Sequence, residues 1–385
     1  MNIKEIRARK IKDSRDDYTI EVSVNGQKAS SPSGKSTGKY ETSCYHNSIK
    51  WNIKAINSLK IPFKIFTFND LKKVEFLIEK KFNLKDPKQF GANALFALES
   101  AILKALAKSQ NKELWQIINL NAKKIPVPVG NAIGGGLHSH NKEHPEFQEF
   151  LLIPKGKDIK ENVKIMNEIY RKLKSIIKSN SKNDEGAWQT SIPNEEVLEI
   201  LSKFYNINIG LDVASSSFYK NAGYQYKNKL LNRKAQIHYM NSLIKRYNIF
   251  YLEDPIQEED FNGFSRIASK NRSSRTSVLV VGDDLTATHI SRLKKAMKNK
   301  SINAMIIKPN QNGSLIELQE IFNICKSNNI KTIISHRSAE TLDNALADYA
   351  VGFQADFIKC GIATKWREVK LKRLIEINNY IKAYK

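Results

Sequence analysis

The segment 278–313, VLVVGDDLTATHISRLKKAMKNKSINAMIIKPNQNG, constrains the fold of this chain more than any other stretch. Two apolar runs flank an amphipathic stretch in which apolar residues recur at helical spacing from Ile290 to Met297. This pattern predicts strand, helix, strand, and such apolar runs are typical of parallel strands buried on both faces. The first run ends at Asp283 and the second at Lys308. Since catalytic side chains project from the carboxyl edge of barrel and doubly wound sheets, these two residues are a candidate metal ligand and a candidate base.

The same pattern recurs on both sides of this segment. The run INIGLD ends at Asp212, NIFYLED follows with Glu253, KTIISH ends at His336, and ADFIK ends at Lys359. From Glu253 onward the charged ends are separated by about 23 to 30 residues, the length of one strand, one helix and their loops. A single charged residue at such a position is as often a solvated loop residue as a functional one. Six in succession predict a repeated βα unit.

The first third of the chain has a different pattern. Residues 3–30 alternate apolar and polar side chains and reach Asn25-Gly26, which indicates a hairpin in an antiparallel sheet. From about residue 51 to 121 the spacing is helical, most clearly in ANALFALESAILKALAKSQ. This part of the chain is therefore expected to be α+β.

A domain boundary is expected about a third of the way along the chain. A chain of 385 residues holds about two domains. Pro126 and Pro128 interrupt the chain, so we place the boundary there, with an α+β domain over 1–125. The remaining 126–385, about 260 residues, have the usual size of a TIM-type (β/α)8 barrel.

Composition excludes some classes of protein. No apolar run is long enough to span a bilayer and the start lacks a signal-peptide core, so we expect a soluble cytoplasmic protein without a membrane partner. Three widely spaced cysteines show neither a disulfide framework nor metal-binding spacing. The net charge of +24 favours anionic partners, but the lysines are spread along the chain, so a nucleic-acid role stays open without being required.

Two short motifs are set aside. The Gly-Lys-Ser of 34–36 is like the end of a phosphate-binding P-loop, but the glycine required five residues earlier is Ala29, and no buried strand precedes it. The loop histidines His138, His140 and His144 are a weak zinc motif, and a loop role is favoured for them.

Many ordered motifs resemble one family, the enolases, which interconvert 2-phosphoglycerate and phosphoenolpyruvate in glycolysis and gluconeogenesis. PSGKSTGKYE at 32–41 resembles the family's mobile serine loop, and GANALFAL at 91–98 resembles its first long helix. QEF, NDEG, GLDVASS, LEDP, VGDDL, IKPNQNG, SHRSAET and IKCG follow in the family order. The resemblance runs from about residue 3 to 375. It implies an enolase-type barrel over 126–385, preceded by an α+β capping domain over 1–125.

The resemblance also implies a metal site. Asp212, Glu253 and Asp283 match the family's magnesium ligands, and hard carboxylate oxygens suit that ion. Two Mg²⁺ ions are implied, the second recruited with the substrate. Ser36 matches the lid serine that helps to hold the second ion. Positive charge is required because removing a proton next to a carboxylate creates a dianionic enediolate, a chemistry for which the enolase superfamily is itself a standard example.

The catalytic roles follow from the same resemblance. Lys308 matches the base that removes the C2 proton, which needs a pKa lowered by nearby cations. Lys359 matches the lysine at the substrate carboxylate. Glu185 matches the general acid and Glu149 its supporting carboxylate, and a pair of acids can keep one of them protonated. His336 matches a residue beside the substrate.

Substrate contacts are implied as well. The matching positions are His138, Gln148, Arg337, Ser338 and Ser36. The planar fork of Arg337 suits a phosphate. We prefer His138 as the loop histidine because it keeps the family's GGxH pattern. The gap to Glu149 is two residues longer than usual, so His140 stays open.

Several departures from the family pattern fall on loops and edges. DSRGNPTVEV is DSRDDYTIEV here, GDEGG is NDEGA, IKTGAP is IKCGIA, and Ser217 replaces an acid. They put lid closure, substrate fit and subunit contacts in question, and whether the chain forms a dimer or an octamer stays open. Two alternatives to an active enolase are a relative that dehydrates another acid, and a weak or inactive homologue that binds nucleic acid.

Overall fold

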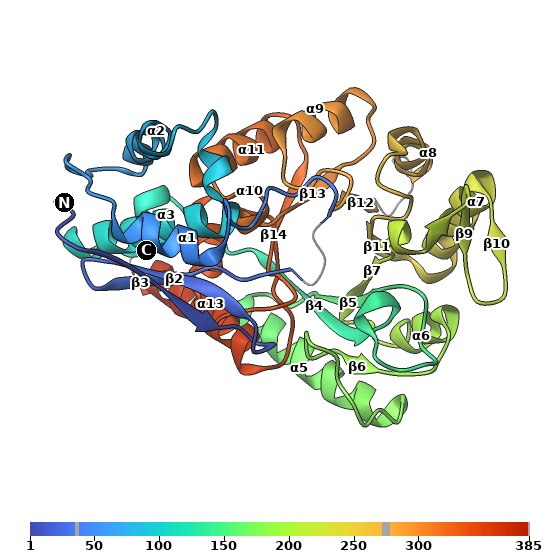
Figure 1. The fold of residues 1–385 in the computed structure, drawn as a ribbon. Helices are drawn as coiled ribbons and strands as arrows, with labels where there is room; N and C mark the ends of the chain where they lie inside the picture. Colours follow the sequence, from blue (N-terminus) through green and yellow to red (C-terminus); the bar gives the residue numbers. More distant parts are fainter. Residues whose placement is uncertain (35–37, 272–277, 384–385) are drawn as a thin grey trace.

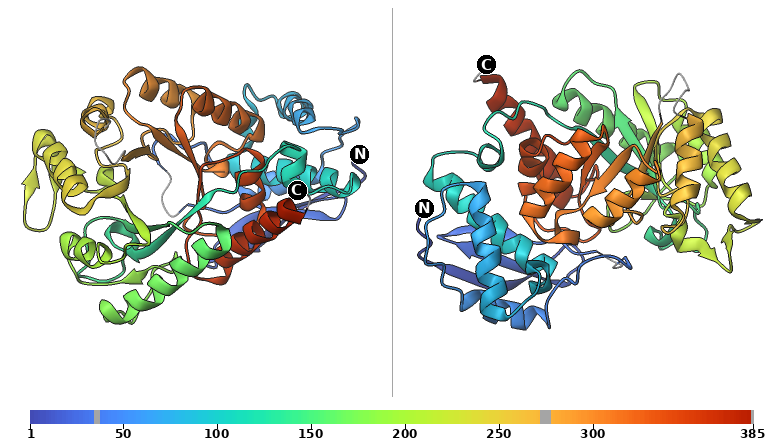
Figure 2. Two further views of the ribbon diagram at one scale, coloured as in Figure 1. Left: turned by 180° about the vertical axis from the view of Figure 1, so that it is seen from behind. Right: turned by 90° about the horizontal axis from the view of Figure 1, so that it is seen from above.

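The computed structural model describes residues 1–34, 38–271 and 278–383. A three-stranded sheet with helices lies beside a barrel of strands that is ringed by helices (Figures 1 and 2). The predicted fold class, an α+β domain followed by a TIM-type barrel, is confirmed. Within the described ranges, no helix is both long enough and apolar enough to cross a membrane.

The N-terminal sheet is the predicted hairpin with one more strand. Its antiparallel strands are β1 (Ile6–Lys12), β2 (Tyr18–Val24) and β3 (Gln27–Ser30). Between β2 and β3, Asn25 and Gly26 have φ angles of 48° and 82°. Both angles are positive, as a two-residue hairpin turn of type I′ requires, and Asn-Gly is the pair that adopts it most readily.

The helices of this domain follow the sheet in sequence, and α1 and α3 pack on it. They are α1 (Ile49–Asn57), η1 (Phe68–Asp70), α2 (Leu71–Phe82), η2 (Pro87–Phe90), α3 (Ala92–Ser109) and α4 (Leu114–Ile118). Helix α3 packs on β2 and β3, and it also contacts α10 (Pro309–Asn312) of the barrel domain. The helix is consequently buried over most of its length, which accounts for its Ala- and Leu-rich sequence.

Eight strands of the described chain form the closed barrel. In barrel order they are β4 (Val127–Gly134), β5 (Glu149–Pro154), β7 (Ile207–Asp212), β11 (Ile249–Glu253), β12 (Leu279–Gly282), β13 (Ala304–Ile307), β14 (Lys331–Ser335) and β15 (Phe357–Lys359). Pairing of β15 with β4 closes the ring. The strands from β7 to β15 run parallel, so their carboxyl ends share one edge, as the charged ends of the sequence predicted.

Helices and short elements surround the strands. The outer helices are α5 (Ile159–Ile176), α6 (Asn194–Leu201), α7 (Arg233–Tyr247), α8 (Phe261–Asn271), α9 (Ile290–Lys298), α11 (Leu315–Ser327), α12 (Ala345–Gly352) and α13 (Lys365–Ala383). Shorter elements are η3 (Gly136–His138), β6 (Trp188–Gln189), η4 (Ser215–Phe218), β8 (Tyr219–Lys220), β9 (Gly223–Gln225) and β10 (Leu230–Leu231).

One barrel strand runs against the others. Strand β5 pairs antiparallel with both β4 and β7. Its first residue, Glu149, therefore pairs with Asp212, the last residue of β7. This reversal brings the start of β5 to the edge where the other strands end, so a residue at the beginning of a strand joins residues at the ends of its neighbours.

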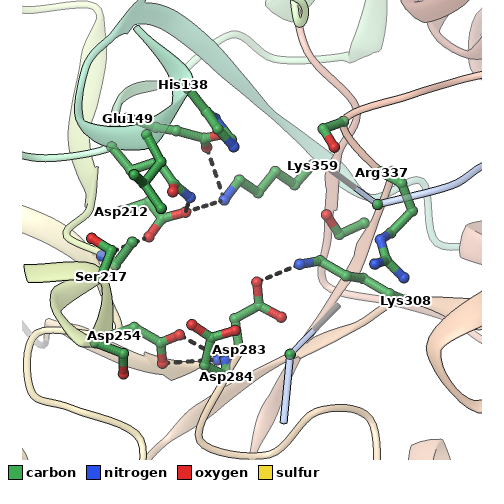
Figure 3. A pocket seen from close by; sticks show the side chains of 18 of the residues that line it. His138, Glu149, Asp212, Ser217, Asp254, Asp283, Asp284, Lys308, Arg337 and Lys359 are labelled. Atoms are coloured by element: carbon green, nitrogen blue, oxygen red, sulfur yellow. Dashed lines mark hydrogen bonds and ion pairs between the residues drawn. The ribbon is translucent and has the colours of Figure 1, made fainter. Parts of the chain in front are cut away.

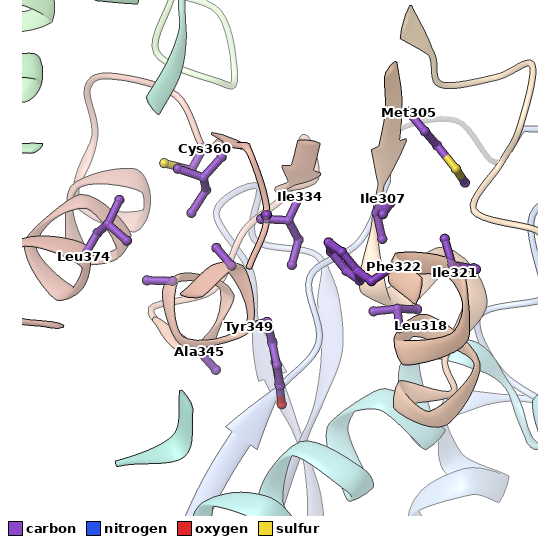
Figure 4. Close-up of a cluster of buried hydrophobic side chains, with 14 of the residues drawn as sticks. Met305, Ile307, Leu318, Ile321, Phe322, Ile334, Ala345, Tyr349, Cys360 and Leu374 are labelled. Atoms are coloured by element: carbon purple, nitrogen blue, oxygen red, sulfur yellow. The ribbon is translucent and has the colours of Figure 1, made fainter. Parts of the chain in front are cut away.

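Two apolar layers hold the barrel. Side chains that point inward, such as Leu151, Tyr251 and Ile306, fill its centre. The outward-facing side chains of the same strands pack against the helices, and Figure 4 shows Ile334 and Phe322 in this layer between β14 and α11. Since successive side chains of a strand point to opposite faces, both layers require near-continuous apolar strands.

Candidate active site

The carboxyl edge of the barrel surrounds a polar cavity of about 270 Å³. Its wall includes most of the residues singled out from the sequence, namely His138, Gln148, Glu149, Glu185, Asp212, Asp283, Lys308, His336, Arg337, Ser338 and Lys359. Glu253 lies beneath the wall and is fully buried. Ser36 falls outside the described residues.

Lys359 lies at the centre of the buried carboxylates. Its Nζ is 2.9 Å from Glu149 Oε2, 3.1 Å from Asp212 Oδ2 and 2.9 Å from both oxygens of Glu253. The hydroxyl of Tyr251 donates to Glu253 Oε2 at 2.6 Å. One ammonium group thus faces three carboxylates in a region that excludes water, where each interaction is far stronger than at the surface.

Lys308 has a different partner. Its Nζ is 2.5 Å from Asp283 Oδ2, and both lysines extend into the cavity toward carboxylates (Figure 3). Burial lowers the pKa of Lys308, but the negative charge of Asp283 outweighs it and the pKa is raised overall. This differs from the sequence-based expectation of a lowered pKa. The cations Arg337 and Lys359 do act in the expected direction, and the contact with Asp283 exceeds them.

A second cluster joins acids and histidines. His138 Nδ1 is 3.5 Å from Glu149 Oε1 and 3.9 Å from Glu185 Oε1, and His336 Nε2 is 4.0 Å from Glu185 Oε2. Burial raises the pKa of Glu185, but the charge of His138 and a hydrogen bond with Glu149 outweigh it and lower the pKa to about 2. The contacts with His138 and Glu149 therefore oppose protonation of Glu185 in this arrangement.

The predicted metal ligands meet at this edge. Asp212 ends β7, Glu253 ends β11, and Asp283 follows β12, the next strand in the barrel. Burial and the charge of Asp212 raise the pKa of Glu253, and Asp283 adds to this, so the three negative charges act on one another.

Their chemistry fits a divalent cation. Asp283 Oδ1 is buried and accepts no hydrogen bond from the described part of the chain. A buried acceptor without a donor is costly unless a positive group approaches it. An all-carboxylate set suits a hard ion such as magnesium.

Asp254 supports the same edge by accepting from the backbone that follows β12. Its Oδ1 accepts from the backbone N–H of Asp283 at 3.1 Å and its Oδ2 from that of Asp284 at 2.7 Å. Its own φ of 41° lies in the left-handed region, a strained conformation for a residue with a side chain. Asp254, Asp283 and Asp284 also form a carboxylate group with ligand atoms within 4.8 Å of one another.

Further cationic and neutral polar groups line the cavity. Arg337 Nη2 donates to Glu41 Oε2 at 2.7 Å. The guanidinium of Arg15 donates to the hydroxyl of Ser338. Gln148 Nε2 donates to Asp212 Oδ2 at 3.4 Å, which joins the loop before β5 to the carboxylates.

The structure separates the two loop histidines. His138 lines the cavity, whereas the ring of His140 is about half exposed and bonds Asp184 at 3.1 Å. Gln189 Oε1 accepts from the backbone N–H of His140 at 2.8 Å and from the hydroxyl of Ser139 at 3.2 Å. The longer loop is therefore held to the turn that carries Asp184.

Sequence reasoning missed several wall residues. Glu41, Asp254, Asp284 and Glu258 line the cavity without having been assigned a role. Asp254 and Asp284 directly follow residues that were identified, so adjacent carboxylates were the available signal. For Glu41 the only signal was its place at the end of PSGKSTGKYE.

Comparison with known proteins shows the family of this chain. Residues 3–118 match the family model "Enolase, N-terminal domain" and residues 122–384 match "Enolase, C-terminal TIM barrel domain". Relatives named enolase include those of Methanosphaera stadtmanae (36% identical, covering 97% of this chain and 96% of the relative), Ehrlichia canis (35%, 99% and 97%) and Natronomonas pharaonis (33%, 97% and 98%). The chain therefore belongs to the enolase family of hydro-lyases.

Proposed function

We propose that this protein catalyses the magnesium-dependent, reversible dehydration of 2-phosphoglycerate to phosphoenolpyruvate in glycolysis and gluconeogenesis. The observation that carries the proposal is the pair of lysines, Lys308 and Lys359, facing carboxylates in one cavity in a chain of the enolase family. Proton removal next to a carboxylate needs a base and a fixed positive charge for the developing anion, and one lysine is proposed for each role.

Asp212, Glu253 and Asp283 would hold a magnesium ion, and Ser36 would help to hold a second. When bound, magnesium supplies positive charge for the anion that develops as the proton next to the substrate carboxylate is lost. Asp283 Oδ1, which is buried and accepts no hydrogen bond from the described part of the chain, supports this assignment.

Lys308 Nζ is the proposed base for the C2 proton. It must lose its own proton first, and the contact with Asp283 opposes this by raising its pKa. The charges of Arg337 and Lys359 favour the neutral amine. Lys359 Nζ, fixed by three carboxylates, then faces the substrate carboxylate and stabilises its developing charge.

Loss of the C3 hydroxyl needs an acid. Glu185 is proposed to deliver the proton, which it must first take up against its lowered pKa, with Glu149 as its partner and with His138 and His336 within 3.9 and 4.0 Å. Arg337, Ser338 and Gln148 are proposed to hold the substrate, with the arginine fork at the phosphate.

The test is formation of phosphoenolpyruvate from 2-phosphoglycerate by the purified protein, with and without magnesium, beside Lys308→Ala. We expect magnesium-dependent turnover in the wild type and a loss of about 10³- to 10⁴-fold in the variant, the upper range for a general base. No turnover in folded, magnesium-supplied wild type would overturn the assignment. Turnover of another 2-hydroxy acid, but not of 2-phosphoglycerate, would show that the site acts on a different substrate.

We further propose a cytoplasmic homo-oligomer, a dimer or an octamer, with a domain boundary between residues 125 and 126. Membership of a family that is commonly oligomeric supports the first part, and β4 begins just after the proposed boundary. Light scattering of the purified chain tests the oligomeric state, and a monomer at micromolar concentration would contradict it.

A further inference from the structure

Glu41 forms a buried junction in the cavity wall. Its side chain is 7% exposed. Oε2 accepts from Arg337 Nη2 at 2.7 Å, while Oε1 accepts from the backbone N–H of Gly38 at 3.0 Å and from Gln311 Nε2 at 3.2 Å. One carboxylate therefore joins three segments that are far apart in the sequence.

This carboxylate is poorly placed for phosphate affinity alone. It carries a negative charge 2.7 Å from the arginine proposed to receive the substrate phosphate. A like charge so near weakens the attraction of a phosphate to Arg337. Burying the ion pair also costs desolvation, so a favourable contact energy alone is a weak reason for its presence.

The contacts around Arg337 indicate that Glu41 helps to fix the orientation of its guanidinium group. Besides Nη2, its Nη1 donates to Asn310 Oδ1 at 3.3 Å, and its backbone N–H donates to Glu340 Oε1 at 3.1 Å. Its planar guanidinium is thus held by Glu41 on one nitrogen and by Asn310 on another. A planar fork recognises a phosphate well only when its plane is fixed.

The same junction reaches the proposed base. Gln311 Oε1 accepts from the hydroxyl of Thr288 at 2.7 Å, and Thr288 Oγ1 accepts from the backbone N–H of Lys308 at 3.0 Å. A continuous series of hydrogen bonds therefore runs from Glu41 through Gln311 and Thr288 to the backbone of Lys308. The arginine and the base are placed relative to each other by side chains that need not touch the substrate.

We propose that Glu41 is a positioning residue for the substrate phosphate. It fixes the guanidinium plane of Arg337 relative to Lys308, and it does so at the expense of phosphate affinity. The inference rests on the proposed function, because it takes Arg337 as the residue that receives the phosphate.

The test compares Glu41→Gln with wild type in the full-length, magnesium-supplied protein. Removing the charge while keeping the shape is expected to tighten the binding of inorganic phosphate, measured by calorimetry, by about threefold to tenfold. The kcat for 2-phosphoglycerate is expected to fall about tenfold, without a rise in KM, because orientation and not affinity is lost. Glu41→Asp keeps the charge and is expected to return phosphate affinity close to the wild-type value.

Asp348→Asn is the matched control. Asp348 on α12 accepts from Arg373 Nε at 2.9 Å and Nη2 at 2.7 Å, with a side chain only 3% exposed, and it lies outside the cavity wall. The control is expected to lower thermal stability while phosphate affinity, kcat and KM stay unchanged. If Glu41→Gln behaves in the same way, the pair with Arg337 is only structural and the inference is overturned.

The outcomes also separate this inference from the proposed function. A wild type that converts 2-phosphoglycerate, with Glu41→Gln unchanged in phosphate affinity and in kcat, would overturn the inference alone. A wild type that binds phosphate more weakly than Glu41→Gln but forms no phosphoenolpyruvate would support the junction at Arg337 and overturn the proposed reaction.

Discussion

The residues at the cavity are held in two different ways. One group, which we call the strand-end wall, contains the last residues of barrel strands, Asp212, Glu253 and Lys359, and the backbone pairs Glu253 directly with Asp212. The other group, which we call the connecting wall, contains residues such as Glu41 and Glu185, which lie in connecting segments held by side-chain contacts. Asn183 Oδ1, for example, accepts from the backbone N–H of Glu185 at 3.0 Å.

This difference predicts different failures on substitution. Strand ends are placed by a ladder of backbone hydrogen bonds that a side-chain change does not remove. Substitution there changes charge balance. Connecting segments lose their position when one side chain is removed, so substitution there changes geometry with a smaller effect on charge.

The largest effect is expected for Lys359→Ala. Removing this ammonium leaves Glu149, Asp212 and Glu253 buried and mutually repelling, which is expected to cost about 3–5 kcal/mol of the free energy of unfolding. Urea unfolding in the presence of a chelator measures the change, and turnover is expected to fall about 10³-fold. Excess magnesium is expected to recover part of the stability by binding the folded state. Wild-type stability in the variant would show that the strand-end wall does not depend on this charge.

A smaller effect is expected on the connecting wall for Gln189→Ala. Its Oε1 holds Ser139 and His140 in the loop that carries His138. Loss of the amide is expected to lower kcat/KM about tenfold by displacing this loop, with a stability loss of about 1–3 kcal/mol.

Asn303→Ala is the control for that substitution. Asn303 Oδ1 accepts from the backbone N–H of Val280 at 2.7 Å, and its Nδ2 donates to the carbonyl of Val278 at 2.9 Å, at the amino end of β12. It is expected to lose similar stability with unchanged turnover. Equal turnover losses in the two variants would remove the distinction between the walls.

The same difference explains what the sequence could predict. Charged residues after apolar runs predicted the edge at which Asp212, Asp283 and Lys308 meet, because backbone pairing alone brings strand ends together. The Asn25-Gly26 hairpin followed from local turn chemistry. Both kinds of signal are contained in short segments.

Features that depend on distant segments were not predictable from these patterns. The reversal of β5, which brings Glu149 opposite Asp212, depends on a connection after β4 that contains no α-helix. The contact between Glu41 and Arg337 joins residues 296 positions apart. The raised pKa of Lys308 follows from its contact with Asp283, and that proximity depends on side-chain conformations that no spacing specifies.

The smallest effect is expected outside both walls, where Lys104 of α3 meets Asp343 in the segment after β14. Lys104 Nζ is 2.8 Å from both oxygens of Asp343, and the backbone N–H of Ser30 donates to Oδ2 at 2.9 Å. Burial raises the pKa of Asp343, but the charge of Lys104 outweighs it and the pKa is lowered below the ordinary 3.8. The ionised carboxylate therefore stabilises the fold above pH 3.8, and this contribution is lost as the pH falls through the lower, folded-state pKa.

Lys104→Met is accordingly expected to cost about 1–2 kcal/mol near neutral pH, and the gap from wild type is expected to narrow as the pH falls below 3.8. Urea unfolding at several pH values measures both quantities. Turnover at neutral pH is expected to be unchanged, since neither residue lines the cavity. A gap that stays constant down to pH 3 would mean that Lys104 acts through the packing of its aliphatic chain and not through Asp343. A loss of turnover would mean that contacts between α3 and the barrel position the catalytic wall, and the distinction between strand ends and connecting segments would then have to include the sheet and helices beside the barrel.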